Sequence, residues 1–348
     1  MIDKFKGTMI GSALGDAIGE LVLYLHSEGV AKHKIDHSIT IKSILASIKE
    51  TDQLKYTDDT AMAIGIAESL CGTDYINDDH ITERFCANYN YNPGRGYGPN
   101  TETILCMINE LHTTRQEATE KVNKLFHKAD HTGEGSCGNG AAMRINPAGI
   151  FFHDSSDIDF YKSISIISKI THLHPVGVDG ACVLAKAVSI AAKSVSIDPQ
   201  AFIQQLIDFS QTKTIRKKMI KIKKLIKRNI SYDRAAKILG RSVAVHESMP
   251  FAIYSFLKNT ESYIDCLFAA ILNGGDADTV GAMACGISGA YLGIESIPKE
   301  WINKLEDSEY ISALSIKLYN NKTKSDQRTF EQWRAEIQLD QDEELEEL

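Results

Sequence analysis

Hydrophobic positions recur along most of the chain at the three- and four-residue spacing of α-helices, and strict alternation is rare. Only 7 of the 348 residues are proline. The pattern predicts an all-α fold, a single compact helical bundle. Residues 26–55 are polar and histidine-bearing, which predicts a loop or an excursion from the bundle. Helices are expected over about residues 4–24, 59–71 and 213–228, from about residue 178 onward, and within residues 273–293.

A row of glycines runs along the first predicted helix: Gly7, Gly11, Gly15 and Gly19 are four residues apart. Glycine costs an exposed helix about 1 kcal/mol relative to alanine, so the row needs another explanation. Without side chains, these positions let the backbone of a second helix approach closely, as in membrane helices. We therefore expect a tightly packed core helix. Asp16, which interrupts its small apolar face, is a candidate to point into a site.

Two aspartates stand side by side ahead of an apolar run in residues 57–60, Thr-Asp-Asp-Thr. Threonine or aspartate at a helix start caps free backbone amides, and a carboxylate there favours the helix dipole. Neighbouring residues cannot share a helix face, so one cap accounts for only one of Asp58 and Asp59. The other aspartate needs a second partner, most simply solvent or a cation.

A second acidic turn, Asp276-Ala277-Asp278-Thr279, follows a Gly-Gly pair and also precedes a small apolar helix. If the two helix starts face one another, four carboxylates and two hydroxyls converge. Such a cluster repels itself unless a cation is bound, and oxygen ligands favour Mg²⁺, Mn²⁺ or Ca²⁺ over zinc. A pair of ordinary acidic helix caps is the alternative explanation.

Two glycine-rich loops, residues 89–103 and 131–152, each precede a helix or an apolar run. Backbone N–H groups in such a loop can hold a phosphate group, although glycine-rich turns are common. His172 and His174 stand before a predicted helix start. One of them is a candidate phosphate contact, and His174 equally suits a helix cap or the core. Arg144 is expected to be structural and to pair with an acid.

Composition narrows the functional classes. A net charge of −8 argues against a general nucleic-acid binder, and we find neither an apolar stretch of membrane-spanning length nor a secretory signal. The 7 cysteines are scattered without a CxxC pair, which indicates reduced thiols in the cytoplasm rather than disulfides or zinc.

The basic residues 213–228 suit a solvated helix face, with an anionic surface contact as the alternative. No internal boundary is visible, so we expect one domain over residues 1–335 and an acidic, disordered tail over residues 336–348.

Six stretches, taken in order, resemble motifs of the ADP-ribosylglycohydrolase family: GSALGDAIGE, YTDDTAMA, RGYG, GSCGNGAAMR, THLHPVGVDGA and GGDADTVGAMACGISGAYLG. The resemblance covers roughly residues 4–300. It implies an all-α fold whose cleft holds a binuclear Mg²⁺ centre, with Mn²⁺ as the alternative metal. It also implies hydrolysis of the bond between C1″ of ADP-ribose and an amino-acid side chain.

By this resemblance the two acidic turns supply the metal ligands, and Asp58 or Asp59 also acts as the catalytic base toward water. The glycine-rich loops are expected to grip ADP-ribose. The implied metal ligands are Thr57, Asp58, Asp59, Asp276, Asp278 and Thr279. The implied ADP-ribose-binding residues are Gly96, Tyr97, Gly98, Gly135, Ser136, Cys137, Asn139 and His172.

One position departs from the family pattern. Many members carry a glutamate seven residues after the aspartate of the first motif. Counting from Asp16, this chain has Leu23 there, and Glu20 lies on a different helix face. In serine-specific members that glutamate is tied to the metal and to gating of the cleft. Its absence slightly favours ADP-ribosyl-arginine as the substrate.

The alternatives are a hydrolase of ADP-ribosyl-serine, poly-ADP-ribose or O-acetyl-ADP-ribose, and a non-catalytic ADP-ribose-binding protein. The expected partners are an ADP-ribosylated protein as substrate and ADP-ribose as product. The glutamate-rich C-terminus, residues 339–348, also resembles the translocation signals of some bacterial effectors. In that case the target is a host protein; a solvated tail on a cytoplasmic protein is the alternative.

Overall fold

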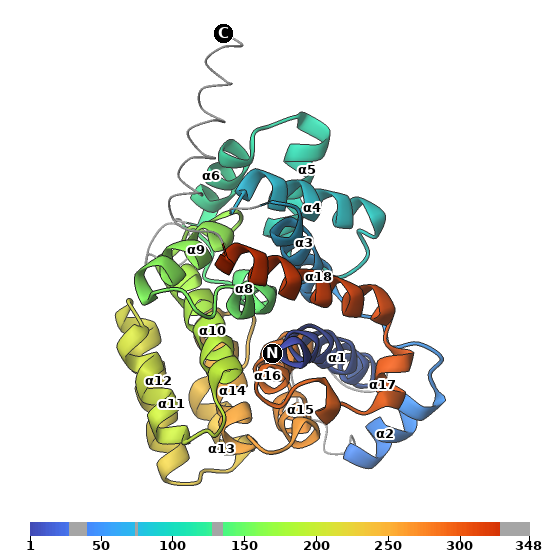
Figure 1. Cartoon of the computed structure of the whole chain (residues 1–348), viewed down its shortest axis with the longest axis vertical. Helices are drawn as coiled ribbons and strands as arrows, with labels where there is room; N and C mark the ends of the chain where they lie inside the picture. The colour runs from blue at the N-terminus through green and yellow to red at the C-terminus, as the bar shows by residue number, and fades with distance from the viewer. Residues whose placement is uncertain (28–39, 74–75, 127–134, 328–348) are drawn as a thin grey trace.

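The computed structural model describes residues 1–27, 40–73, 76–126 and 135–327, which form helices joined by short connections (Figure 1). These residues contain no strand, only two isolated bridges between single residues. The predicted all-α fold is confirmed. The helices are α1 (Ile2–Ser27), α2 (Ile41–Glu50), α3 (Asp58–Gly72), α4 (Asp78–Tyr91), α5 (Pro99–Leu111), α6 (Arg115–Phe126), α7 (Gly140–Met143), α8 (Asn146–Phe151), α9 (Asp157–Lys169), α10 (Pro175–Lys193), α11 (Pro199–Phe209), α12 (Lys213–Lys227), α13 (Tyr232–Leu239), α14 (Val245–Lys258), α15 (Tyr263–Ile271), α16 (Ala277–Leu292), the 3₁₀ turn η1 (Ile294–Ser296), α17 (Lys299–Lys304) and α18 (Ser308–Gln327).

α1 and α16 lie side by side in the bundle (Figure 1). Their glycines face each other. A Cβ added at Gly15 would lie 2.3 Å from the carbonyl oxygen of Gly281, and one added at Gly289 would lie 1.9 Å from that of Gly7. These distances leave no room for a side chain, so the glycine row brings two backbones into direct contact, as its spacing predicts.

α10 is buried along almost its whole length, from Gly177 to Ala192. It packs against α8, α9, α14 and α16. The helix begins at Pro175, slightly before the predicted start, because His174 is its N-cap. The Val176 N–H donates a hydrogen bond to His174 Nδ1 over 3.1 Å. His174 is therefore a helix cap, which is one of the roles expected for it.

The expectation of a loop across residues 26–55 is wrong for part of that range. α2 occupies Ile41–Glu50 and begins with a capping box at Thr40. Ile44 and Ile48 are buried on one face of this helix. A short amphipathic helix is easily missed among polar residues, because only a narrow stripe of it is apolar.

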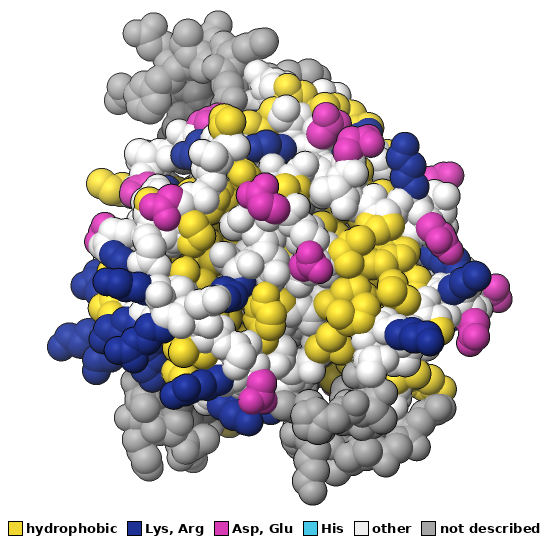
Figure 2. Space-filling view, turned by 90° about the horizontal axis from the view of Figure 1, so that it is seen from below, with side chains coloured by type: hydrophobic (Ala, Val, Ile, Leu, Met, Phe, Trp, Pro, Cys, Tyr) yellow, Lys and Arg dark blue, Asp and Glu magenta, His cyan; other side chains and the backbone are white. Residues whose placement is uncertain are grey.

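α12 has the two faces that its sequence predicts. Most of its Lys and Arg side chains are exposed, and Figure 2 shows such side chains gathered on one side of the face seen from below. The apolar side packs onto α11 and α14, so this arrangement fits a solvated helix face. The buried residues of α12 are Ile215, Met219, Ile222 and Leu225.

Two helices are long and apolar enough to span a membrane, contrary to the expectation of none. They are Ile2–Leu25 and Pro175–Lys193. In the structure 72% of the first apolar window and 89% of the second are buried. Both therefore serve as core helices of the bundle, a role that requires the same apolar composition.

The acidic C-terminal stretch and Gly133 of the second glycine-rich loop lie outside the described residues. The domain boundary after residue 335 and the roles considered for the tail stay predictions.

The contact between α1 and α16 can be tested by adding one methyl group. Gly15→Ala should lower the free energy of unfolding by about 3 kcal/mol, the upper end of overpacking costs, since backbone rather than a flexible side chain would have to move. Chemical denaturation measures the effect. Gly98→Ala is the control, because a Cβ there meets nothing within 4 Å; equal stability of the two variants would contradict the close contact.

Candidate active site

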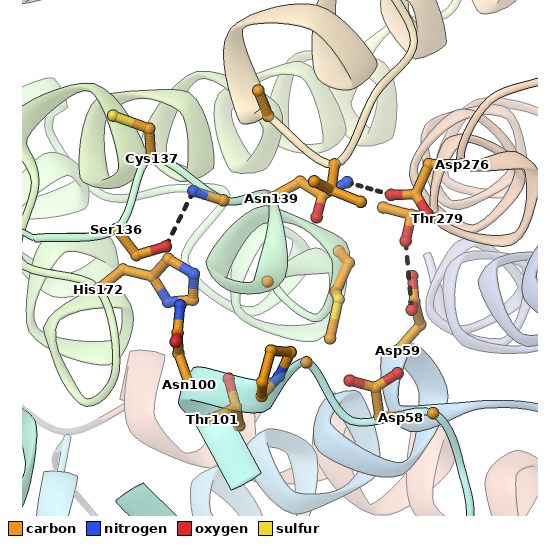
Figure 3. Close-up of a pocket in the computed structure, with 18 of the residues that line it drawn as sticks. Asp58, Asp59, Asn100, Thr101, Ser136, Cys137, Asn139, His172, Asp276 and Thr279 are labelled. Atoms are coloured by element: carbon orange, nitrogen blue, oxygen red, sulfur yellow. Dashed lines mark hydrogen bonds between the residues drawn. The ribbon is translucent and has the colours of Figure 1, made fainter. Parts of the chain in front are cut away.

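The starts of α3 and α16 meet on one side of a cavity of about 460 Å³. Asp58 and Asp59 occupy the first turn of α3, while Asp276 is the N-cap of α16 and Asp278 lies in its first turn. The Thr279 hydroxyl donates a hydrogen bond to Asp59 Oδ2 over 3.4 Å. The structure thus brings both acidic turns to one cavity, as the sequence predicts, and Figure 3 shows this acidic group on one side of it.

Asp16 of α1 holds the first turn of α3 in place. Its carboxylate accepts hydrogen bonds from the backbone N–H groups of Thr57 at 3.0 Å and Thr60 at 3.1 Å. The hydroxyls of the same two residues donate to it over 2.9 and 2.6 Å. Asp16 is fully buried and does not line the cavity. It therefore points at a helix start rather than into the site, and Thr57, which it engages, also lies outside the cavity lining.

Arg95 ties the same helix start to a distant segment. Its guanidinium stacks 3.9 Å from the Tyr56 ring centroid and donates to the Tyr56 carbonyl oxygen over 2.7 Å. Both terminal nitrogens donate to Glu306 over 3.0 Å. The Arg95 carbonyl oxygen accepts from the Asp58 N–H over 2.9 Å. The position of Asp58 therefore depends on a residue between α17 and α18.

The glycine-rich segment from residue 135 forms the opposite wall of the cavity (Figure 3). Ser136 is anchored by its N–H, which donates to Asn123 Oδ1 over 3.0 Å. The Asn139 N–H donates to the Val243 carbonyl oxygen over 2.8 Å. Asn139 also reaches across to the acidic group, because its amide donates to Asp276 Oδ2 over 2.6 Å. One wall thus offers backbone and neutral polar groups, and the other offers carboxylates.

His172 and Arg144 sit beside this wall. His172 is buried, its Nδ1 lies 2.7 Å from the Thr171 hydroxyl, and burial together with Arg144 lowers its pKa to about 3. The imidazole is therefore neutral. Burial lowers the pKa of Arg144 to about 9.

The prediction that Arg144 pairs with an acid is wrong for the described residues. Its guanidinium donates to the Thr171 hydroxyl over 2.7 Å and lies 4.6 Å from the Phe85 ring centroid. The sequence suggested an acid because a buried charge usually needs one. Here an aromatic face and a hydroxyl take that place, and Asp58 acts on Arg144 only at longer range.

Most of the predicted ADP-ribose-binding residues line the cavity, but Tyr97 does not. Tyr97 is buried against Tyr89, with ring centroids 5.1 Å apart. Sequence reasoning missed Asn100, Thr101 and Val243, which carry no motif and reach the cavity only through the fold. The predicted residues that do line it are Gly96, Gly98, Gly135, Ser136, Cys137, Asn139 and His172.

Ionisation of the carboxyls in this acidic group is unfavourable. Burial raises the pKa of Asp58 to about 7, with the Asp16 charge as the second cause. Burial and neighbouring aspartates also raise the pKa values of Asp59 and Asp278 well above the usual range, and burial raises that of Asp276. Asp59 Oδ1 is buried and accepts no hydrogen bond from the described residues. A bound cation would relieve this repulsion.

These donors fit a hard divalent cation. They are all oxygens, the ligands that Mg²⁺ and Mn²⁺ prefer, and Asp59 Oδ1 is a buried acceptor that lacks a partner. Within the part of the chain that the structure describes, no three His, Cys, Asp or Glu side chains converge tightly enough to hold a metal. The fold therefore gathers predicted ligands without displaying a coordination sphere.

Known proteins align with this chain over most of its length. A family model for ADP-ribosylglycohydrolase matches residues 1–328. The chain belongs to the ADP-ribosylglycohydrolase family. Mouse ADP-ribosylhydrolase ARH3 is 28% identical to it, over 91% of each chain. The ADP-ribosyl-[dinitrogen reductase] glycohydrolase of Rhodospirillum rubrum is 24% identical, over 87% of this chain and 90% of its own.

A solved structure also has the fold of this chain. It is described as an "ADP-ribosylglycohydrolase-related protein complex" and matches with a TM-score of 0.64. The match covers 92% of this chain and 98% of the other at 19% identity. At that identity the likeness concerns the fold alone.

The departure at Leu23 has a structural counterpart in this chain. Leu23 packs against the hydrophobic core. Glu20 is exposed and lines a second, smaller cavity together with Asp58 and Asp278. The chain thus keeps a carboxylate near the acidic group, one helical turn earlier than the family pattern.

The raised pKa values predict how stability depends on pH and metal. A carboxyl whose folded-state pKa is raised stays protonated in the folded protein at a pH where it ionises in the unfolded chain. In EDTA the melting temperature should therefore fall as the pH rises from about 4 toward about 7, the pKa of Asp58. Mg²⁺ at about a hundred times its Kd should add about 2.7 kcal/mol at pH 7.5, and less at pH 5. Thermal unfolding with and without Mg²⁺ measures both effects. A melting temperature that rises over this range in EDTA would contradict the reasoning.

The Arg95–Glu306 pair should contribute more to the free energy of unfolding than a surface ion pair does. Arg95→Met is expected to cost about 3 kcal/mol of unfolding free energy, because it leaves a partly buried carboxylate unpaired. Arg115→Met is the matched control, since Arg115 pairs with the more exposed Asp78 and Asp79 and should cost less than about 1 kcal/mol. Urea unfolding of both variants provides the comparison, and similar losses would refute the anchoring role.

Proposed function

We propose that this chain hydrolyses the C1″ glycosidic bond of ADP-ribosylated protein side chains and releases ADP-ribose. The observation that carries the proposal is the two-walled cavity of about 460 Å³, with buried and half-buried aspartates on one side and a neutral glycine-rich wall on the other. The names of the two relatives support the reaction class, and that of the Rhodospirillum rubrum enzyme specifies a modified protein.

The two walls suggest how ADP-ribose lies in the cavity. The segment from Gly135 to Gly140 presents backbone N–H groups and small side chains, which suit a diphosphate. His172 stands beside it as a neutral imidazole whose pKa is lowered by burial, so it serves as a hydrogen-bonding group rather than a cation. The distal ribose and its C1″ carbon then fall next to Asp58 and Asp59.

Asp58, Asp59, Asp276, Asp278 and Thr279 would hold the proposed Mg²⁺ pair. When bound, those ions supply Lewis-acid polarisation and orient the ribose hydroxyls. In hydrolysis a water oxygen bonds to C1″, the bond from C1″ to the side chain breaks, and the proton from water ends on the leaving group. Asp58 or Asp59 first takes the proton from the water and then gives it to the leaving group, and the remaining carboxylates stabilise the positive charge that develops at C1″.

ADP-ribosyl-arginine is the first linkage to test. Leu23 replaces the glutamate that serine-specific members carry, which favours arginine slightly. ADP-ribosyl-serine, poly-ADP-ribose and O-acetyl-ADP-ribose remain the competing substrates. Free ADP-ribose, measured from each defined substrate in Mg²⁺ and in EDTA, separates them.

Removing both carboxylates of the α3 start should stop the reaction. Asp58→Asn combined with Asp59→Asn is expected to lower kcat at least about a thousandfold, because general-base assistance alone contributes up to that order. Release of ADP-ribose measures kcat, and circular dichroism checks that the helices persist. Asp78→Asn with Asp79→Asn is the matched control, since these aspartates also stand side by side at a helix start but outside the cavity. Full activity of the first double variant would overturn the assignment.

A further inference from the structure

Thr171 lies between a buried cation and the histidine of the cavity wall. Arg144 Nη2 donates a hydrogen bond to the Thr171 hydroxyl oxygen over 2.7 Å, and the same oxygen lies 2.7 Å from His172 Nδ1. All three side chains are buried. A guanidinium carries only donors, so the direction of the first hydrogen bond is fixed and constrains the second.

The Thr171 hydroxyl has one proton to place. If this proton points to His172 Nδ1, the hydroxyl accepts from Arg144 and donates to the imidazole, and both contacts are hydrogen bonds. If Nδ1 carried a proton instead, the hydroxyl would accept twice, and its own proton would find no acceptor among the described residues. A buried donor without a partner is costly. The network therefore favours the neutral tautomer of His172 with a bare Nδ1 and a proton on Nε2.

The Nε2 edge of His172 meets the cavity. This nitrogen has no hydrogen-bond partner among the described residues. A Cβ added at Gly140 would lie 2.9 Å from Cε1 of the ring and 3.2 Å from Nε2, so glycine keeps this edge of the ring clear. His172 lines the cavity, and Figure 3 shows its ring beside Ser136 there. A proton on Nε2 is thus available to a ligand at this end of the cavity.

Asn123 fixes the same histidine segment against the glycine-rich wall. Its amide donates to the Thr171 carbonyl oxygen over 2.9 Å. Its Oδ1 accepts from the N–H groups of Ser136 and Leu173 over 3.0 and 3.1 Å. One side chain thus joins the residues on both sides of His172 to the wall. The position of the imidazole is thereby set separately from the placement of its proton.

We propose that Arg144 is a positioning residue: through Thr171 it fixes His172 as a hydrogen-bond donor at Nε2, which selects an anionic oxygen as the ligand there. This inference rests on the proposed function for the identity of that ligand, the diphosphate of ADP-ribose. It also gives a chemical role to the hydroxyl that takes the place of an acid beside Arg144. A carboxylate there would accept a proton from Nδ1 and leave a neutral imidazole with a bare Nε2, whose lone pair repels phosphate.

The tautomer can be observed directly in the ligand-free protein by ¹⁵N NMR of labelled histidines, with the His172 signals assigned by their loss in His172→Gln. The wild type should carry a proton on Nε2 and none on Nδ1. Arg144→Met frees the Thr171 oxygen to accept from Nδ1, so both tautomers should be populated, whereas Arg144→Lys keeps a donor and should preserve the wild-type form. Thr171→Val should also release the preference, and Thr171→Ser should keep it.

The same variants test what the donor binds. At saturating Mg²⁺, Thr171→Val and Arg144→Met should weaken ADP-ribose binding about tenfold in calorimetry, as expected for the loss of one hydrogen bond to a charged group. Stabilisation by Mg²⁺ in thermal unfolding should not change. Thr119→Val is the matched control, because the buried Thr119 hydroxyl donates to the Ile170 carbonyl oxygen over 2.6 Å and does not line the cavity. It should lower stability while leaving the tautomer and the ADP-ribose affinity unchanged.

A proton on Nδ1 in the wild type would overturn the proposal, and this spectrum decides it even if no variant folds. A relaxed tautomer in Thr171→Val with unchanged ADP-ribose affinity would show that Nε2 does not bind the ligand, and the positioning role would be wrong. If the wild type binds ADP-ribose but releases none from any defined substrate, the proposed function fails while the positioning role stands. If it binds no ADP-ribose, both fail.

Discussion

Both acidic helix starts are positioned by α1. On one face, its glycine row lets α16 approach until backbone meets backbone, and the row ends at Gly19, where an added Cβ would lie 2.5 Å from Asp278 Cα. On another face, Asp16 accepts the hydrogen bonds that α3 cannot make at its own N-terminus. A single helix thus fixes the distance between the two halves of the site.

This arrangement gathers carboxyl groups whose charged forms destabilise the folded protein. Three buried aspartates, Asp16, Asp58 and Asp59, and two half-buried ones, Asp276 and Asp278, lie within one region. Burial disfavours their charged forms. Asp16 is compensated by four hydrogen-bond donors, whereas Asp59 Oδ1 has no partner among the described residues. The aspartate that positions a helix is therefore well supplied with hydrogen bonds. The aspartates that face the cavity have fewer partners: Asp59 Oδ2 accepts from the Thr279 hydroxyl, and Asp276 Oδ2 accepts from the Asn139 amide.

The fold class, the close helix pair and the two acidic turns could be read from the sequence because each follows from local spacing. Whether an acidic pair is buried at a cavity or exposed on the surface could not be predicted from the sequence. Asp78 and Asp79 repeat the pattern of Asp58 and Asp59 at the start of α4, yet they are partly or largely exposed and bind Arg115. Burial separates the two pairs, and burial depends on the whole bundle.

Contacts between residues far apart in the sequence could not be predicted either. Arg95 and Glu306 are 211 residues apart, and neither residue type indicates the other. Arg144 suggested an acid, but Phe85 and Thr171 surround it instead. The short helix α2 was missed because its apolar stripe is narrow. Such features arise from packing between segments, which no local pattern records.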